Sequence, residues 1–459
     1  MSGKRQKTQL QLALFAESRG EAPMAASVGT EPVAAERGPE RQVSVGLMEA
    51  VVAVENVKEA LRRVRTNKGA PGVDGMRVSQ LPKYLRKHWP ELREQLLNGS
   101  YQPQPVRRVE IPKPGGGVRQ LGIPTALDRF VQQALLQVLQ AQWDASFSAH
   151  SYGFRPGRSA HQAVAQAQEY LGAGCRWVVD IDLEKFFDRV NHDVLMGRVA
   201  KRVDDKRVLK LVRSFLNCGV LADGLVSPTA EGTPQGGPLS PLLSNLLLDD
   251  LDRELERRGL NFVRYADDCN IYVRSQRAGE RVMASVTEFL ARRLKLQVNA
   301  HKSAVDRPWK RKFLGLSFTN HRQPKRRIAP QSIQRFKQRV RELTSRNQGR
   351  SLDRVVAELS RYLTGWLGYF GFCETASVLA GLEEWLRRRL RCLLWKQWKR
   401  SRRRYQELTS RGVSRGEARQ TVGSARSLWR LSRTKALHLA LPKDYFTSLG
   451  LPRLVIQTP

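Results

Sequence analysis

The most informative shortage in this 459-residue sequence is of acidic side chains. Asp and Glu together number 43, against 79 Lys and Arg, which leaves a formal charge of +36. Such an excess indicates a polyanionic partner, because Lys and Arg that neutralise phosphates release condensed counterions. We therefore expect the chain to bind nucleic acid; the weaker alternatives are a basic protein that is merely soluble and one that binds an anionic membrane surface.

Cysteines and long apolar runs are also scarce. The five cysteines are scattered and form no CxxC pair: Cys175, Cys218, Cys269, Cys373 and Cys392. This pattern is typical of a reducing compartment and excludes the usual zinc-ligand spacing, so we expect no structural zinc. The sequence has no apolar run of about 18 residues and no signal-peptide core at its N-terminus. It therefore predicts a cytoplasmic protein that does not span a membrane.

The chain is too long for one core and mixes helical with strand patterns. Residues 1–46, rich in Ala, Gly, Glu and Pro over their later part, are predicted to be a disordered leader. Apolar spacing predicts helices at 47–65 and 126–143, and β-rich runs predict strands at 109–112, 118–123, 177–183, 262–265 and 270–273. Beyond Pro330 the pattern is helical. The sequence therefore predicts an α+β region followed by a separate helical module.

Three carboxylates are the strongest indication of chemistry. Asp182 ends one apolar run, and Asp267 and Asp268 lie in the turn between two others. Most Asp-Asp pairs are solvated turn residues, but carboxylates that converge at the ends of buried strands repel one another unless a cation neutralises them. Two divalent ions about 4 Å apart catalyse phosphoryl transfer, and Mg²⁺ prefers carboxylate oxygens. These residues therefore predict a two-metal site.

Three motifs around these aspartates resemble those of reverse transcriptases. Residues 265–268, Tyr-Ala-Asp-Asp, look like the catalytic box, and residues 182–188 look like the first aspartate motif. Residues 232–241 are similar to the motif that positions template and nucleotide in group II intron reverse transcriptases. The order and spacing match, and the resemblance extends from the loop 68–75 through 151–159 to the end of the chain.

The resemblance implies an α+β right-hand polymerase followed by a helical domain. Fingers with an N-terminal extension would occupy residues 47–170, and a palm with an antiparallel sheet, together with part of the fingers, would occupy 171–322. An α-helical thumb, also called the maturase domain, would occupy 323–459. The implied activity is extension of a DNA primer on an RNA template with dNTPs, using two Mg²⁺ ions that Mn²⁺ can replace.

The family's catalytic residues match particular positions of this sequence. The resemblance implies that Asp182, Asp267 and Asp268 hold the metal, with Asp268 the least direct ligand. Asp180 shares a strand face with Asp182, but the family motif begins at Asp182, so Asp180 is left outside the site. Lys302 matches a lysine that protonates the leaving pyrophosphate.

Five further positions match residues that contact the substrate. Lys113 and Arg119, on the predicted hairpin, match the basic pair that clasps the nucleotide triphosphate. Gln235 and Gly236 match residues over the nascent base pair, where a side chain larger than hydrogen at 236 would crowd the template. Phe187 matches the bulky gate beneath the sugar, and its alternative role is that of an aromatic in the core.

The C-terminal part of the chain is strongly basic. Residues 383–433 contain 16 Lys and Arg but only four Glu. One helical stripe is apolar: Leu386, Leu390, Leu393, Leu394 and Trp398. Arg387, Arg388 and Arg391 are predicted to lie opposite this stripe and to bind RNA phosphates. Three tryptophans are expected to pack in the core rather than to stack on bases: Trp385, Trp395 and Trp429.

The leading interpretation is a group II intron reverse transcriptase that also binds its structured intron RNA and assists splicing and mobility. Alternatives are a host-adopted reverse transcriptase for defence or repair, a retron or diversity-generating type, an RNA polymerase, and a splicing cofactor with an inactive core. The intact aspartates, Phe187 and the motif at 232–241 favour the leading interpretation. After Cys392 the sequence has no cysteine and one histidine, His438, so we expect no C-terminal nuclease. The sequence leaves the oligomeric state open.

Overall fold

The computed structural model describes residues 46–112, 117–222, 225–227, 231–233, 236–347 and 349–455. The chain divides into two compact units, one ending at Asp306 and the other beginning at Arg307. The predicted leader lies outside the described residues except for Gly46. Among the described residues, no helix is both long and apolar enough to cross a bilayer.

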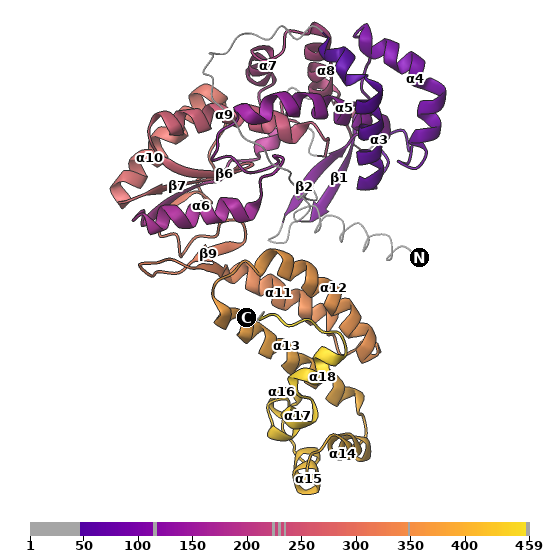
Figure 1. Cartoon of the computed structure of the whole chain (residues 1–459), viewed down its shortest axis with the longest axis vertical. Coiled ribbons are helices and arrows are strands. Elements are labelled where there is room, and N and C mark those ends of the chain that lie inside the picture. The colour runs from indigo at the N-terminus through magenta and orange to yellow at the C-terminus, as the bar shows by residue number, and fades with distance from the viewer. Residues whose placement is uncertain are drawn as a thin grey trace, which may run out of the picture. The chain divides into compact units, whose positions relative to one another are not determined.

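The first unit mixes helices with two four-stranded sheets (Figure 1). Its helices are α2 Leu47–Val51, α3 Val54–Asn67, α4 Leu81–Leu97, α5 Ala126–Trp143, α6 Ala160–Gly172, α7 His192–Ala200, α8 Lys206–Asn217, α9 Ser240–Arg257 and α10 Gln276–Phe289. Its strands are β1 Val106–Pro112, β2 Val118–Ile123, β3 Trp177–Ile181, β4 Val220–Ala222, β5 Leu225–Ser227, β6 Asn261–Tyr265, β7 Asp268–Val273 and β8 Ala304–Asp306. Short helical turns lie at Asp144–Ser146 and Phe186–Asp188, and a π-helical turn at Leu290–Leu294 follows α10.

The two sheets differ in their strand pairing. One has the order β2-β1-β4-β5, with β1 and β4 parallel, and the other has the order β6-β7-β3-β8 with antiparallel pairing throughout. The second sheet contains the predicted aspartate strands, and α6, α9 and α10 pack against it. The predicted antiparallel sheet is thus confirmed.

Helix α5 lies at the centre of the first unit. Thr125 caps its N-terminus by accepting a hydrogen bond from the backbone N–H of Asp128 at 3.0 Å. The Asp128 carboxylate is buried and accepts further bonds from Tyr101 at 2.8 Å and from the Thr125 hydroxyl at 2.6 Å. Leu135 and Leu139, on the same helix, have no exposed surface. The start of α5 is therefore fixed by polar contacts and its body by the apolar core.

The second unit is a helical module with one small hairpin. Its strands are β9 Leu316–Phe318 and β10 Arg326–Ile328. Its helices are α11 Pro330–Leu343, α12 Leu352–Phe370, α13 Ala376–Gln397, α14 Ser401–Ser410, α15 Arg415–Val422, α16 Leu428–Leu431, α17 Lys435–Ala440 and α18 Lys443–Ser448. The whole predicted apolar stripe of the basic region is buried, from Leu386 on α13 to Trp398 just after it.

Most predicted elements of the first unit are confirmed, with two differences in extent. The predicted helix 47–65 is broken at Val52 and Ala53 into α2 and α3. The predicted strand 177–183 ends at Ile181, so Asp182 lies just beyond the strand and Leu183 forms an isolated bridge with Val298. The sequence predicted the boundary between palm and thumb after residue 322, whereas the boundary between the two compact units lies after Asp306.

Candidate active site

The turn between β6 and β7 presents two of the predicted aspartates. Tyr265 pairs with Asp268, so Ala266 and Asp267 form a two-residue turn. Ala266 has φ of 56°, in the left-handed region that a residue with a Cβ seldom adopts. Asp267 is partly exposed and Asp268 is exposed. The turn therefore holds both carboxylates at the surface at the end of a buried hairpin, in a backbone conformation that needs support.

Residues 150–153 supply part of that support. The backbone N–H of Tyr152 donates to the carbonyl of Arg264 at 2.9 Å. Gly153 lies so close to the turn that a Cβ at this position would come within 2.2 Å of the Ala266 nitrogen. Asn245, on α9, donates to the Gly153 carbonyl at 2.8 Å. Only glycine fits at residue 153, because any side chain would push the turn away from the segment that braces it.

Arg264 connects the turn to the interior of the unit. Its guanidinium group is fully buried and forms two bonds to the Asp252 carboxylate, at 2.7 and 2.5 Å. It also donates to the Asn245 side chain at 2.9 Å, to the Ala266 carbonyl at 3.0 Å and to the Ser151 hydroxyl at 2.8 Å. One side chain thus binds α9, the bracing segment and the turn itself.

The energetic balance of this ion pair explains why all its partners are present. Burial raises the pKa of the Asp252 carboxyl, and the charge of Arg264 together with its hydrogen bonds opposes that rise. A buried ion pair is favourable only when its remaining donors and acceptors are satisfied. The motif comparison did not find Arg264. The sequence did carry one indication of this role. Arg264 lies among the apolar residues of a predicted buried strand, and a charge in that position needs a buried partner.

Strand register brings Asp182 to the same place. β3 and β7 are antiparallel, with Ile181 opposite Cys269, so Asp182 follows β3 on the side where Asp268 begins β7. The backbone of Asp182 is held by two residues of a later segment. Its N–H donates to the Ser303 hydroxyl at 2.9 Å, and its carbonyl accepts from the Asn299 N–H at 2.8 Å.

The same later segment brings Lys302 to Asp182. The Lys302 ammonium nitrogen lies 3.4 Å from Oδ1 of Asp182; the Lys302 side chain is exposed and that of Asp182 partly exposed. Lys302 therefore lies beside one of the three aspartates, and its catalytic role stays a prediction. Asp180, which the sequence left outside the site, lies within β3 opposite Asn270, whose amide group can donate to its Oδ1 at 3.1 Å.

The donor set suits a hard divalent cation. Asp182, Asp267 and Asp268 offer only carboxylate oxygens, the ligand type that Mg²⁺ prefers. Burial, with a further contribution from Asp252, raises the pKa of the neighbouring Cys269 thiol, so it is not a ready thiolate ligand. Within the described residues, no three His, Cys, Asp or Glu side chains are gathered as a metal-binding group. The carboxylates are thus placed at one sheet end but are not clustered around one point.

Phe187 lies on the helical turn Phe186–Asp188, not on a strand extending from Asp182. Its side chain is half-buried, packs on the core and meets the Phe186 ring edge-on, with 5.2 Å between centroids. Its carbonyl accepts from the Thr233 N–H at 2.7 Å. Phe187 is therefore anchored to the predicted template-positioning motif on one side and to the core on the other.

Gly236 is constrained by the protein itself. Its φ is 137°, and a Cβ at this position would lie 2.6 Å from the carbonyl oxygen of Gly122 on β2. The resemblance implied that glycine is needed here because a larger side chain would crowd the template. The structure adds a second reason, which is the close approach of this loop to β2.

Of the three remaining residues predicted to contact the substrate, the structure describes only the backbone of Arg119. Lys113 and Gln235 lie outside the described residues. The backbone of Arg119 lies on β2 opposite Ile111. The predicted hairpin is therefore present, and the triphosphate contact of its basic pair stays a prediction.

The predicted RNA-binding arginines of α13 have partners inside the second unit. Arg391 is 4% exposed and donates to the Leu441 carbonyl at 3.1 Å. Burial, together with the charge of Arg387, lowers its pKa to about 10. Arg387 forms an ion pair with Glu383, and Arg388 donates to the Trp429 carbonyl at 2.6 Å. Arg391 was expected to face RNA phosphates, and its burial contradicts that expectation. The side of α13 that carries Arg391 is covered by other residues of the unit.

Comparison with known families agrees with this architecture. Residues 111–318 match the reverse transcriptase (RNA-dependent DNA polymerase) family, and residues 333–412 match the group II intron maturase-specific domain. Protein YkfC of Escherichia coli (strain K12) is 35% identical over 300 residues, which cover 56% of this chain and 78% of that protein. The group II intron-encoded protein LtrA of Lactococcus lactis subsp. cremoris is 35% identical over 206 residues, which cover 45% of this chain but only 34% of LtrA.

Solved structures give more distant likenesses. A partial Cas6-RT-Cas1–Cas2 complex is 24% identical with a TM-score of 0.36, over 58% of this chain and 46% of that chain. Telomerase from Candida albicans in complex with a fragment of telomeric RNA is 13% identical with a TM-score of 0.40, over 64% of this chain and 59% of that chain.

The strand-end aspartates and the two family matches define the class of protein, an RNA-directed DNA polymerase joined to a maturase-specific domain. The chain belongs to the group II intron reverse transcriptase and maturase family. The predicted family, fold class and enzyme class are thereby confirmed. Reverse transcriptase domains work with divalent metal ions.

Replacing Arg264 by Met tests the buried network. We expect Arg264→Met to lower the free energy of unfolding by about 3 to 5 kcal/mol, because it leaves the Asp252 carboxylate buried and unpaired. Arg257→Met is the matched control on α9. Its side chain is exposed and its partner Glu254 also pairs with Arg258, so we expect a loss of less than about 1 kcal/mol. Urea unfolding of both variants measures the difference, and equal losses would refute the role given to Arg264.

Proposed function

We propose that this chain extends a DNA primer on an RNA template by using the carboxylates of Asp182, Asp267 and Asp268. One observation carries the proposal. The antiparallel register of β3 and β7 places Asp182 beside Asp268 at one sheet end, with the Lys302 ammonium 3.4 Å from Asp182. The assignment of Mg²⁺, with Mn²⁺ as a substitute, follows from the oxygen-only donor set.

The chemistry is nucleotidyl transfer. When bound, two divalent ions would lower the pKa of the primer 3′-hydroxyl and stabilise the leaving pyrophosphate. Asp182 and Asp267 would hold them, with Asp268 as an additional, more exposed carboxylate. The 3′-hydroxyl loses its proton to water, and its oxygen forms a bond to the α-phosphorus of the dNTP as the bond from that phosphorus to the pyrophosphate oxygen breaks. The Arg264 network serves this step by fixing the turn that carries Asp267.

Lys302 is proposed to act on the leaving group. Its ammonium lies beside Asp182, so a pyrophosphate leaving from the same place would be within reach of its proton. In this account Lys302 donates a proton to the pyrophosphate oxygen as the bond to the α-phosphorus breaks. Lys113 and Arg119 are proposed to hold the triphosphate, and Gln235 and Gly236 to lie over the nascent base pair.

The second unit is proposed to bind structured intron RNA and to assist splicing and mobility. Support comes from the match of residues 333–412 to the maturase-specific domain and from the basic character of this part of the chain. The aspartates belong to the first unit and the maturase-specific match to the second. Under this proposal, polymerase and RNA-binding functions can be separated by mutation.

The aspartates are the first test of the proposal. We expect Asp182→Ala and Asp267→Ala to reduce extension of an oligo-dT primer on poly-rA, with dTTP and Mg²⁺, to less than a few per cent of wild type, because each removes a proposed metal ligand. Their affinity for RNA should change little. Asp193→Ala is the control, since this carboxylate is exposed and forms a surface ion pair with Arg213. Substantial extension by either site variant would contradict the assignment.

Phe187 gives a second test, on sugar selection. A bulky side chain against C2′ rejects a ribonucleotide by collision with its extra hydroxyl. We expect Phe187→Ala to raise UTP use relative to dTTP by one to two orders of magnitude, about 1.4 kcal/mol for each tenfold. The measurement is kcat/KM for both nucleotides, beside a thermal melt.

The alternative role of Phe187 has a different signature. A core aromatic would on truncation cost about 3 to 5 kcal/mol of stability and reduce the use of both nucleotides together. Because Phe187 is half-buried against Phe186, some loss of stability is expected in either case. An unchanged ratio of UTP to dTTP use would therefore remove Phe187 from the proposed site.

A further inference from the structure

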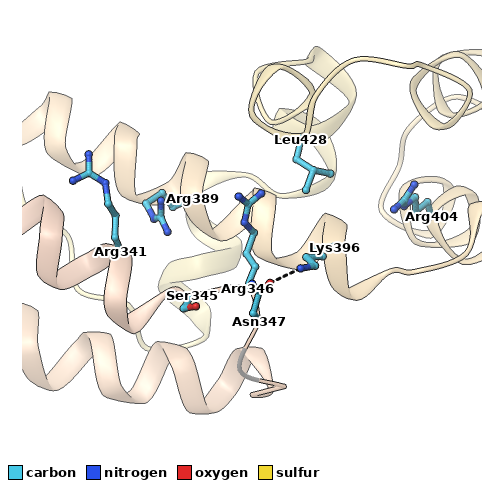
Figure 2. A pocket seen from close by; sticks show the side chains of 8 residues that line it. All are labelled: Arg341, Ser345, Arg346, Asn347, Arg389, Lys396, Arg404 and Leu428. Atoms are coloured by element: carbon cyan, nitrogen blue, oxygen red, sulfur yellow. Dashed lines mark hydrogen bonds between the residues drawn. The ribbon is translucent and has the colours of Figure 1, made fainter.

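A pocket of about 430 Å³ in the second unit is lined by five cationic side chains. Arg341 is exposed in the last turn of α11, and Arg346 follows that helix. Arg389 and Lys396 are two turns apart on α13 and hence on one face, and Arg404 comes from α14. Figure 2 shows these side chains around the pocket. We call these five residues the basic groove.

Carboxylates are missing from the lining of the basic groove. Arg389 donates to the Thr344 hydroxyl at 2.7 Å, Lys396 to the Asn347 side chain at 2.6 Å, and Arg404 to the Trp398 carbonyl at 2.8 Å. Among the described residues of this unit, none of the five cations forms an ion pair with a carboxylate. Partial burial, together with the charges of Arg346 and Arg341, lowers the pKa of Arg389. The groove thus concentrates positive charge that the unit does not neutralise.

Arginines elsewhere on the helices of this unit behave differently. Three of them pair with glutamates in the structure: Arg339 with Glu342, Arg354 with Glu358 and Arg403 with Glu407. Carboxylates are therefore available to arginines of this unit, but none lines the groove. Uncompensated guanidinium groups around a concave surface favour phosphate, which Arg can bind by two hydrogen bonds.

An adjoining pocket adds aromatic surface. It shares Arg341, Arg346 and Arg389 with the groove and is also lined by Trp385 and Trp429. Trp429 is 37% exposed, and the Arg388 guanidinium covers its ring at 3.7 Å. An indole that is held by a stacked guanidinium and still reaches the surface can serve as a platform for a base. Trp395, by contrast, is fully buried and packs in the core as expected.

We propose that the basic groove binds the phosphates of a single-stranded RNA segment and that Trp429 stacks on one of its bases. Cations that follow a groove and aromatic side chains beside them are the combination that binds single strands, since every base has a π-face and unpaired bases are free to stack. The assignment to RNA rests on the RNA binding proposed above for this unit, and it is independent of polymerase activity. The groove cations differ from Arg387, Arg388 and Arg391, which the sequence had indicated.

The test compares two triple variants that remove the same charge. The groove variant combines Arg341→Gln, Arg346→Gln and Lys396→Gln, and the control variant combines Arg339→Gln, Arg354→Gln and Arg403→Gln. Binding of a fluorescein-labelled oligouridylate of about 12 nucleotides is measured by anisotropy over a range of KCl concentrations. Thermal melts of both variants verify folding, and Arg346→Gln alone, at an exposed residue, replaces the groove triple if that variant does not fold.

The expected result is a change in salt dependence for the groove variant only. Each lost phosphate contact on a single strand reduces the slope of log affinity against log salt by about 0.7, so the groove triple should reduce it by about 2 and Arg346→Gln alone by about 0.7. The control triple should keep the wild-type slope within roughly half a unit. Equal slopes for the groove and control variants, or a wild-type slope for Arg346→Gln where it stands in, would overturn the phosphate assignment.

Trp429 and the strandedness of the ligand are tested in the same assay. We expect Trp429→Ala to weaken binding roughly 5- to 100-fold without changing the slope, and Trp429→Phe to retain most of the affinity, because stacking releases no counterions. If the groove variant weakens binding of duplex RNA as much as that of oligouridylate, the single-strand assignment is wrong. The assay contains no primer or dNTP, so a failure of the proposed polymerase activity would not affect its result.

Discussion

The buried ion pair between Arg264 and Asp252 is the interaction on which the candidate active site depends. It crosses from strand β6 to helix α9, and the same guanidinium holds the Ala266 carbonyl and the Ser151 hydroxyl. A buried charge is tolerated only when every donor has a partner, so the network imposes one arrangement on three segments. Within this arrangement Ala266, in the turn that carries Asp267, adopts a left-handed backbone conformation. The surrounding contacts offset the cost of that conformation.

The other half of the site is fixed by backbone contacts. Asp182 lies beyond the end of β3, and its N–H and carbonyl are bound by Ser303 and Asn299, which also bring Lys302 alongside. Two aspartate-bearing segments are therefore held independently and meet through the pairing of β3 with β7. Charges are arranged differently in the second unit. Arg264 has a carboxylate partner, whereas the cations of the basic groove have none among the described residues. The proposed polymerase site and the proposed RNA-binding groove thus differ in their local balance of charge.

Local periodicity and motif spacing predicted much of this structure, including α5, the hairpin of β1 and β2 and the hairpin that carries Asp267. These elements have strong apolar patterns and turn residues between them. The sequence did not predict Arg264, because its role depends on Asp252 and Asn245 of another element. Arg391 was assigned to the wrong environment for a related reason, since one helix pattern does not reveal that α16 to α18 cover a second face of α13. The predicted strand 177–183 was too long, because β3 ends at Ile181 and the next residues contact the segment 297–303 instead.

The central claim is that the strand-end carboxylates bind divalent ions. Titration of the full chain with Mn²⁺, followed by electron paramagnetic resonance, measures this directly, since bound Mn²⁺ loses the signal of the free aqueous ion. The account predicts that Asp267→Ala and Asp182→Ala bind fewer ions or bind them more weakly than wild type, whereas Asp193→Ala binds as wild type does. Identical Mn²⁺ titrations for wild type and all three variants would contradict it.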